Sequence, residues 1–183
     1  AQLAATRDAG AQVAITNPRD AKALNIECIY QTLALADNVD APANVFLGRE
    51  AKLTFGPFSV VHYAAMFREA ARHFAELKSE TRPRDLVRQM SGGQRQAVAI
   101  ARTRLSNPDI LLMDEPTAAI SVRQVAEVLH HIRLLRDQGI AIVLISHRMP
   151  DVFAVADRIV VMRRGVKVAD KPVAQSSPEE VTG

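Results

Sequence analysis

The chain has 183 residues, 48% of them hydrophobic, with 23 lysines and arginines against 20 aspartates and glutamates. This composition supports a buried core for one domain and excludes a largely disordered chain. Basic residues are scattered rather than clustered, which gives no support to nucleic-acid binding. Apolar runs such as 140–145 are far shorter than the ~18 residues of a membrane helix. One cysteine, Cys28, forms no internal disulfide, fits a reducing compartment, and is expected to be a buried packing residue.

Three short apolar segments have the length of strands, at 26–30, 110–113 and 140–145, and helical patterns separate them. Strands that alternate with helices predict an α/β fold with a mostly parallel, buried sheet. We expect residues 1–37 and 105–172 to form this α/β core.

Between residues 38 and 104 the strand signal fades. The segment SVVHYAAMFREAARHFAELKSE, at 59–80, has a long helical pattern that ends before Pro83. We therefore expect residues 38–104 to form a helical subdomain inserted into the α/β core.

The last third predicts a helix, a hairpin and a loose end. Apolar residues recur at helical spacing over 121–138, and Gly139 follows as a stop signal. The segment DRIVVMRRGVKVA predicts two strands around a turn at Arg164-Gly165, which would form a small antiparallel edge. The polar tail at 173–183 is expected to be loosely held.

The stretch MSGGQRQAVAIAR places two adjacent glycines at the start of a predicted helix. Ser91 and Gln94 have the spacing of a capping box, which explains those two residues. Gly92 and Gly93 each cost about 0.5–1 kcal/mol relative to alanine inside a helix. Bare amides at a helix start can also receive a phosphate, so a simple cap and a phosphate site both remain open.

Polar residues follow the ends of the predicted strands. Asp114 and Glu115 come directly after 110–113, where α/β proteins place their ligands. One carboxylate could hold Mg²⁺ while the other orients an attacking water, although an acidic pair can also cap the next helix. His147 follows the strand at 140–145 and is by itself more often structural than catalytic. Gln31 follows the strand at 26–30 and carries no meaning alone. The remaining histidines are assigned to surface or packing roles: His62, His73, His130 and His131.

Taken together and in this order, the motifs resemble the ATP-binding-cassette (ABC) ATPases, a P-loop NTPase-like family. SGGQ at 91–94 resembles the family's signature motif, ILLMDE its Walker B strand, and AAIS at 118–121 its D-loop. Gln31 matches the Q-loop glutamine and His147 the switch histidine. The segments GREAKLTFG, DEPTAAISVRQ and KVADKPVAQSSPEEVTG further resemble the ATPase subunits of bacterial monosaccharide importers of the ribose, xylose and fructose type.

The resemblance implies a role for each matching residue. Asp114 would support Mg²⁺, Glu115 would polarise the attacking water, and His147 would contact the γ-phosphate of ATP. Gln31 would touch the metal or water and report nucleotide state to the membrane partner. The remaining signature residues would contact the γ-phosphate of ATP on an opposite subunit in a head-to-tail dimer: Ser91, Gly92, Gly93 and Gln94.

Two features depart from the family pattern. The D-loop lacks the Leu-Asp ending of many cassettes, and no GxxxxGK[ST] occurs in the sequence. The family places that P-loop just upstream of residue 1, so the chain resembles a cassette without its first strand and P-loop helix. We therefore expect weak ATP binding by the chain itself, exposed apolar surface and marginal stability.

The resemblance implies an ATP-binding and ATP-hydrolysing subunit that energises monosaccharide import. Its partners would be a membrane permease, a second ABC ATPase domain and, indirectly, a periplasmic sugar-binding protein, with no nucleic acid. It would lie peripherally on the cytoplasmic face of the membrane. One alternative is a catalytically silent cassette that acts as a regulatory or interaction module. Another is a cassette ATPase that acts on nucleic acid or on the ribosome.

Overall fold

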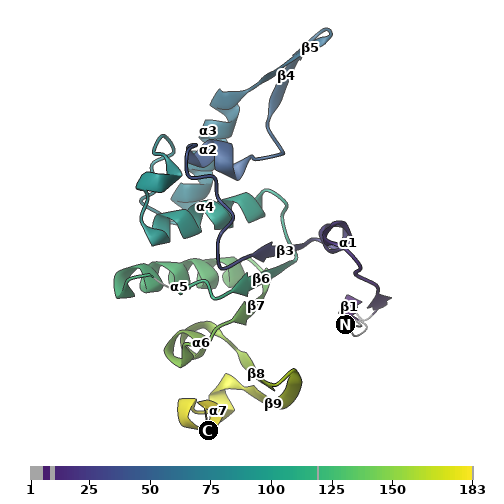
Figure 1. Cartoon of the computed structure of the whole chain (residues 1–183), viewed down its shortest axis with the longest axis vertical. Helices are drawn as coiled ribbons and strands as arrows, with labels where there is room; N and C mark the ends of the chain where they lie inside the picture. Colours follow the sequence, from purple (N-terminus) through teal and green to yellow (C-terminus); the bar gives the residue numbers. More distant parts are fainter. Residues whose placement is uncertain (1–5, 9–10, 119, 183) are drawn as a thin grey trace.

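The computed structural model describes residues 6–8, 11–118 and 120–182. Figure 1 shows an elongated molecule with a helical cluster and a hairpin projecting from it at one end, a three-stranded sheet in the middle and a second hairpin at the other end. Its elements in chain order are β1 (Thr6–Asp8), β2 (Ala11–Val13), α1 (Pro18–Ala23), β3 (Ile26–Ile29), α2 (Ala41–Val45), β4 (Lys52–Phe55), β5 (Phe58–Val61), α3 (Tyr63–Glu76), η1 (Val87–Gln89), α4 (Gly92–Arg104), β6 (Ile110–Asp114), α5 (Val122–Asp137), β7 (Ala141–Ile145), α6 (Met149–Val155), β8 (Arg158–Arg163), β9 (Val166–Pro172), η2 (Val173–Gln175) and α7 (Pro178–Thr182).

The three predicted strands form one parallel sheet in the order β3-β6-β7. Ile29 pairs with Met113, and Asp114 pairs with Ile145, so the carboxyl ends of the strands lie at one edge. The sequence prediction of a parallel α/β core is thereby confirmed. Leu111 and Met113 are fully buried on one face of β6, and Ile110 and Leu112 are partly buried on the other. Because neither face is fully exposed, the strand lacks the apolar–polar alternation of a half-exposed strand.

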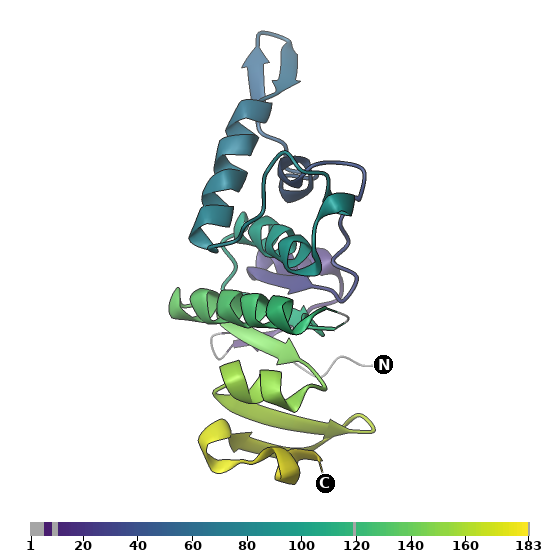
Figure 2. The same ribbon diagram turned by 90° about the vertical axis from the view of Figure 1, so that its left-hand side faces the viewer.

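Helix α4 lies at the centre of the molecule and contacts α2, α3, α5 and β3. Its stretch from Ala97 to Ala101 is almost completely buried. In Figure 2, α4 and α5 lie one above the other and α5 covers the sheet. The predicted helix at 121–138 is present as α5, with Ser121 as N-cap and Gln124 completing a capping box.

The middle segment contains a hairpin where the sequence analysis expected only helices. Strands β4 and β5 pair antiparallel around Gly56, and α3 begins at Tyr63 rather than at Ser59. The β-branched and aromatic residues at 53–61, interrupted by Gly56-Pro57, have the composition of two short strands and a turn. Leu53, Phe55, Phe58 and Val60 alternate onto one face of this hairpin and are 40–73% exposed.

The C-terminal hairpin is confirmed, with Arg164 and Gly165 both at positive φ in the turn between β8 and β9. It forms its own two-stranded sheet, separate from β3-β6-β7. The tail differs from the loose end that we expected. It folds into η2 and α7, α7 packs against α6, and Lys171 pairs with Glu180.

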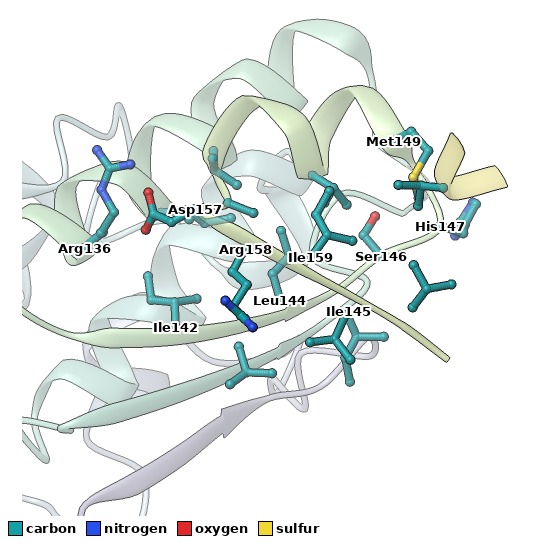
Figure 3. A pocket seen from close by; sticks show the side chains of 18 of the residues that line it. Arg136, Ile142, Leu144, Ile145, Ser146, His147, Met149, Asp157, Arg158 and Ile159 are labelled. Carbon is teal, nitrogen blue, oxygen red and sulfur yellow. The ribbon is translucent and has the colours of Figure 1, made fainter. Parts of the chain in front are cut away.

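A groove of about 970 Å³ separates β7 from β8. Figure 3 shows residues that line it from both strands, with Ile142, Leu144 and Ile145 from β7 and Arg158 and Ile159 from β8. Among the described residues β7 pairs only with β6, so its other edge faces the groove. The side chains of Val143 and Ile145 are 51% and 56% exposed. The exposed apolar surface anticipated from the sequence is therefore present at this edge.

Candidate functional site

Glu115 and His147 meet at the carboxyl ends of β6 and β7. The Oε1 atom of Glu115 lies 2.8 Å from Nδ1 of His147 and accepts a hydrogen bond from the backbone N–H of His147 at 3.0 Å. The register places them together, because the backbone N–H of Glu115 donates to the carbonyl of Ile145 at 2.9 Å. Two residues that are 32 positions apart thus form one site.

The pair is asymmetric in its exposure. The His147 side chain is 75% exposed, whereas that of Glu115 is 18% exposed. The second oxygen of Glu115, Oε2, is buried and has no hydrogen-bond partner among the described residues. Glu115 also has a φ of 48°, a strained value for a side chain of this size. A carboxylate at this position can accept a proton from a water molecule, and a water molecule reaches Oε2 only if the atoms around it move.

Asp114 ends β6, directly before Glu115, and is partly buried. Gln31 is exposed and lies two residues after Ile29, the last residue of the neighbouring strand β3. Both residues therefore belong to the same edge of the sheet as Glu115. Within the described ranges no three His, Cys, Asp or Glu residues are grouped as a metal site. One or two oxygen ligands suit Mg²⁺ that arrives with phosphates, which supply the remaining coordination.

The predicted capping box at the start of α4 is present. The hydroxyl of Ser91 accepts from the N–H of Gln94 at 3.2 Å, and Oε1 of Gln94 accepts from the N–H of Ser91 at 2.9 Å. The side-chain amide of Gln94 also donates to the carbonyl of Glu80 at 3.4 Å.

The two glycines have a packing role that the sequence did not indicate. A Cβ atom on Gly92 would lie 2.5 Å from Cγ2 of Ile120, and one on Gly93 would lie 2.5 Å from Oε2 of Glu127. The start of α4 therefore approaches the segment before α5 and α5 itself closely. Among described residues, no hydrogen bond or ion pair joins 91–94 to Glu115 or His147. Of the D-loop segment 118–121, Ala119 lies outside the described residues.

Sequence reasoning missed a buried polar contact beside the Glu115–His147 pair. Thr117 is 1% exposed and donates from its hydroxyl to Oδ2 of Asp151 at 2.6 Å. The same oxygen lies 3.0 Å from Nε of Arg148. These contacts join the turn after Glu115 to the first turn of α6, which follows His147. A Thr two residues after the acidic pair and an Asp four residues after the histidine are the only signals that the sequence carries.

Burial shifts the pKa values of three further side chains, His131, His73 and Cys28. His131 is buried, and burial together with neighbouring His130 lowers its pKa to about 4. Burial, followed by the charge of Arg104, lowers the pKa of His73. Cys28 is only partly buried on β3, less than its apolar surroundings predicted, and burial raises the pKa of its thiol.

A family model described as ABC transporter matches residues 6–118, more than half of the chain. The chain is 40% identical over 172 residues to a putative ribose/galactose/methyl galactoside import ATP-binding protein of Burkholderia lata, covering 94% of this chain and 33% of that protein. It is 36% identical to the ribose import ATP-binding protein RbsA of Geobacillus kaustophilus, covering 94% and 34%. The galactose/methyl galactoside import ATP-binding protein MglA of Treponema denticola is 33% identical, covering 96% and 36%.

Solved structures agree on the fold. A nucleotide-free ATP-binding cassette from an ABC transporter superposes with a TM-score of 0.72 at 20% identity, covering 94% of this chain and 73% of that one. A dimeric, post-hydrolysis cassette with ADP and phosphate superposes with a TM-score of 0.69 at 21% identity, covering 91% and 72%.

The chain belongs to the ABC transporter family, and the expected ABC ATPase fold is confirmed. It spans about a third of the length of the curated relatives that it matches. In the part of the chain that the structure describes, no helix is both long and apolar enough to cross a membrane.

Proposed function

We propose that this chain is part of an ATP-hydrolysing subunit that drives import of a monosaccharide of the ribose or galactose class. The observation that carries the proposal is the contact of 2.8 Å between Glu115 and His147 at the ends of adjacent parallel strands. The sugar-import names of three relatives, at 33–40% identity, support the substrate class.

In this proposal Glu115 orients and polarises the attacking water. His147, held by Oε1, presents its exposed ring to the terminal phosphate. Asp114 and Gln31 hold Mg²⁺ that enters with the nucleotide. The metal supplies charge neutralisation for the phosphate oxygens. The side chains contribute mainly position and electrostatic stabilisation, as expected for phosphoryl transfer.

Ser91, Gly92, Gly93 and Gln94 serve ATP on a second cassette. The exposed hydroxyl of Ser91 and the amides at the start of α4 suit a phosphate. The residues of this chain do not include a GxxxxGK[ST] cradle, so a full ATP site needs that cradle from outside these 183 residues. The other partners in this proposal are a membrane permease and, indirectly, a periplasmic sugar-binding protein. The subunit would lie on the cytoplasmic face of the membrane.

The alternative is a catalytically silent interaction module. The two are separated by measuring ATP turnover in the complete transporter, reconstituted with its permease and binding protein. Sugar-stimulated turnover that falls about 100-fold or more in Glu115→Gln supports the proposal. Turnover that is unchanged in Glu115→Gln would favour the silent module. Asp137→Asn, an exposed carboxylate in α5, is the matched control.

A further inference from the structure

The turn that follows Gln31 has an unusual backbone. Leu33 and Ala34 have φ angles of 57° and 46°, in the left-handed region that side chains rarely enter. The N–H of Ala34 donates to the carbonyl of Thr32 at 2.7 Å and closes a three-residue turn around Leu33. A turn of this hand is strained around a residue with a side chain. It persists only where surrounding groups hold it.

The side chain of Arg102, in α4, holds this turn. Its Nη1 donates to the carbonyl of Ala34 at 2.8 Å, and its Nη2 donates to the carbonyl of Leu33 at 2.7 Å. The planar fork of a guanidinium can span two successive carbonyls, whereas the point charge of a lysine cannot. Both acceptors are carbonyls of the strained residues.

The far end of the turn is fixed separately. The N–H of Ala36 donates to Oδ1 of Asn44 at 2.7 Å, and Nδ2 of Asn44 donates to the carbonyl of Ala36 at 3.0 Å. Asn44 belongs to α2 and is fully buried. The segment between Gln31 and Ala36 is thus attached to α2 at one end and to α4 in its middle.

Helix α4 extends from this attachment to the predicted phosphate-binding turn. Ser91 is its N-cap, and Arg102 lies eleven residues later, about 16 Å along the axis at 1.5 Å per residue. Gly92–Arg104 is one continuous α-helix, so a displacement of its start is transmitted to Arg102. Ser106, just beyond α4, donates to Glu27 of β3 at 2.6 Å.

We propose that Arg102 is a positioning residue that fixes the Gln31 turn to the helix beginning at Ser91, so that a displacement of this helix moves Gln31. What Gln31 and Ser91 bind rests on the proposed function. The mechanical link rests on the contacts of Arg102 alone.

Hydrogen exchange tests the link on the chain itself. Arg102→Lys and Arg102→Met are expected to speed exchange of the Leu33 and Ala34 amides about tenfold, while the amides of β6 keep their protection. Arg95→Met, at an exposed position of the same helix, should change neither. Unchanged exchange at Leu33 and Ala34 in folded Arg102→Lys would overturn the proposal.

A second measurement needs no variant. In the unchanged chain, NMR should show rotation about the Cζ–Nη bonds of Arg102 slowed about tenfold relative to exposed Arg95, because both Nη groups are engaged. Equal rotation rates would contradict the clamp even if Arg102→Lys fails to fold.

The complete transporter tests whether the link serves ATP turnover. Arg102→Lys should lower kcat about tenfold with KM for ATP within about twofold, since the turn is misplaced but the phosphate contacts remain. Faster exchange without a change in kcat would overturn the assigned role. Failure of the proposed function has a different signature, because Glu115→Gln would then leave turnover unchanged whatever Arg102→Lys does.

Discussion

His147 contacts one oxygen of Glu115 with both its ring Nδ1, at 2.8 Å, and its backbone N–H, at 3.0 Å. The ring contact makes the two side chains one unit rather than two independent groups. Glu115→Gln and His147→Ala should each lower ATP turnover of the complete transporter about 100-fold, and the double variant should lose little more. A double-mutant cycle measures this coupling. Fully additive losses would show that the two side chains act separately.

The two glycines of the signature stretch should differ in their tolerance of a methyl group. The added methyl group of Gly92→Ala would lie against Cγ2 of Ile120, a branched side chain that packs on the core. This substitution should lower the free energy of unfolding by about 1–3 kcal/mol. Gly93→Ala meets only the flexible end of Glu127, so its cost should be under about 1 kcal/mol. Urea unfolding of both variants measures the difference. A larger loss for Gly93→Ala than for Gly92→Ala would contradict this packing account.

Acid should destabilise the fold through His131. Burial lowers its folded pKa to about 4, whereas the unfolded side chain titrates near 6.5. The folded state therefore favours the neutral ring. This contribution is intact above about pH 6.5 and is lost as pH falls toward 4, by up to about 3 kcal/mol. His73, whose pKa is also lowered by burial, adds to the loss in the same direction.

The measurement is the urea midpoint between pH 4 and 7.5. His131→Leu should flatten the pH dependence, whereas His130→Gln, half-buried on the same helix, should keep most of it. An equally steep profile in His131→Leu would assign the acid sensitivity to other groups.

The open edge of β7 should affect solubility more than stability. Val143→Thr and Ile145→Thr replace side chains that are half exposed, so each should change the free energy of unfolding by under about 1 kcal/mol while reducing aggregation. Leu111→Ala, at a fully buried position of β6, should cost about 2–5 kcal/mol. Light scattering and urea unfolding separate the two effects.

The unmodified chain is expected to unfold near or below about 50 °C, at the low end for a domain of ordinary stability. Cooperative unfolding well above that temperature would show that the exposed groove lowers the free energy of unfolding only slightly.

The sequence indicated the sheet because a strand as short and uniformly apolar as 110–113 must bury both of its faces. Such strands occur mainly in parallel sheets that are covered by helices on both sides. The sequence also indicated Asp114 and Glu115 because acidic residues at the carboxyl end of a parallel strand lie where α/β proteins place their ligands. His147 was indicated only by its match to the switch histidine of the ABC ATPases. The β4–β5 hairpin was missed, because its apolar residues are exposed and the adjoining helical pattern of α3 is stronger. The roles of Arg102 and Asp151 depend on contacts between residues 68 and 34 positions apart, which no local pattern encodes.

The separation of β7 from β8 also has a consequence for dynamics. Among described residues no strand pairing joins the β8–β9 hairpin to the parallel sheet. Helix α6, which packs on α5 and α7, forms the main bridge between the two parts. Residues 158–182 can therefore detach without breaking a ladder of the parallel sheet, and they should behave as a separate unit of local unfolding whose amides exchange well before those of β6.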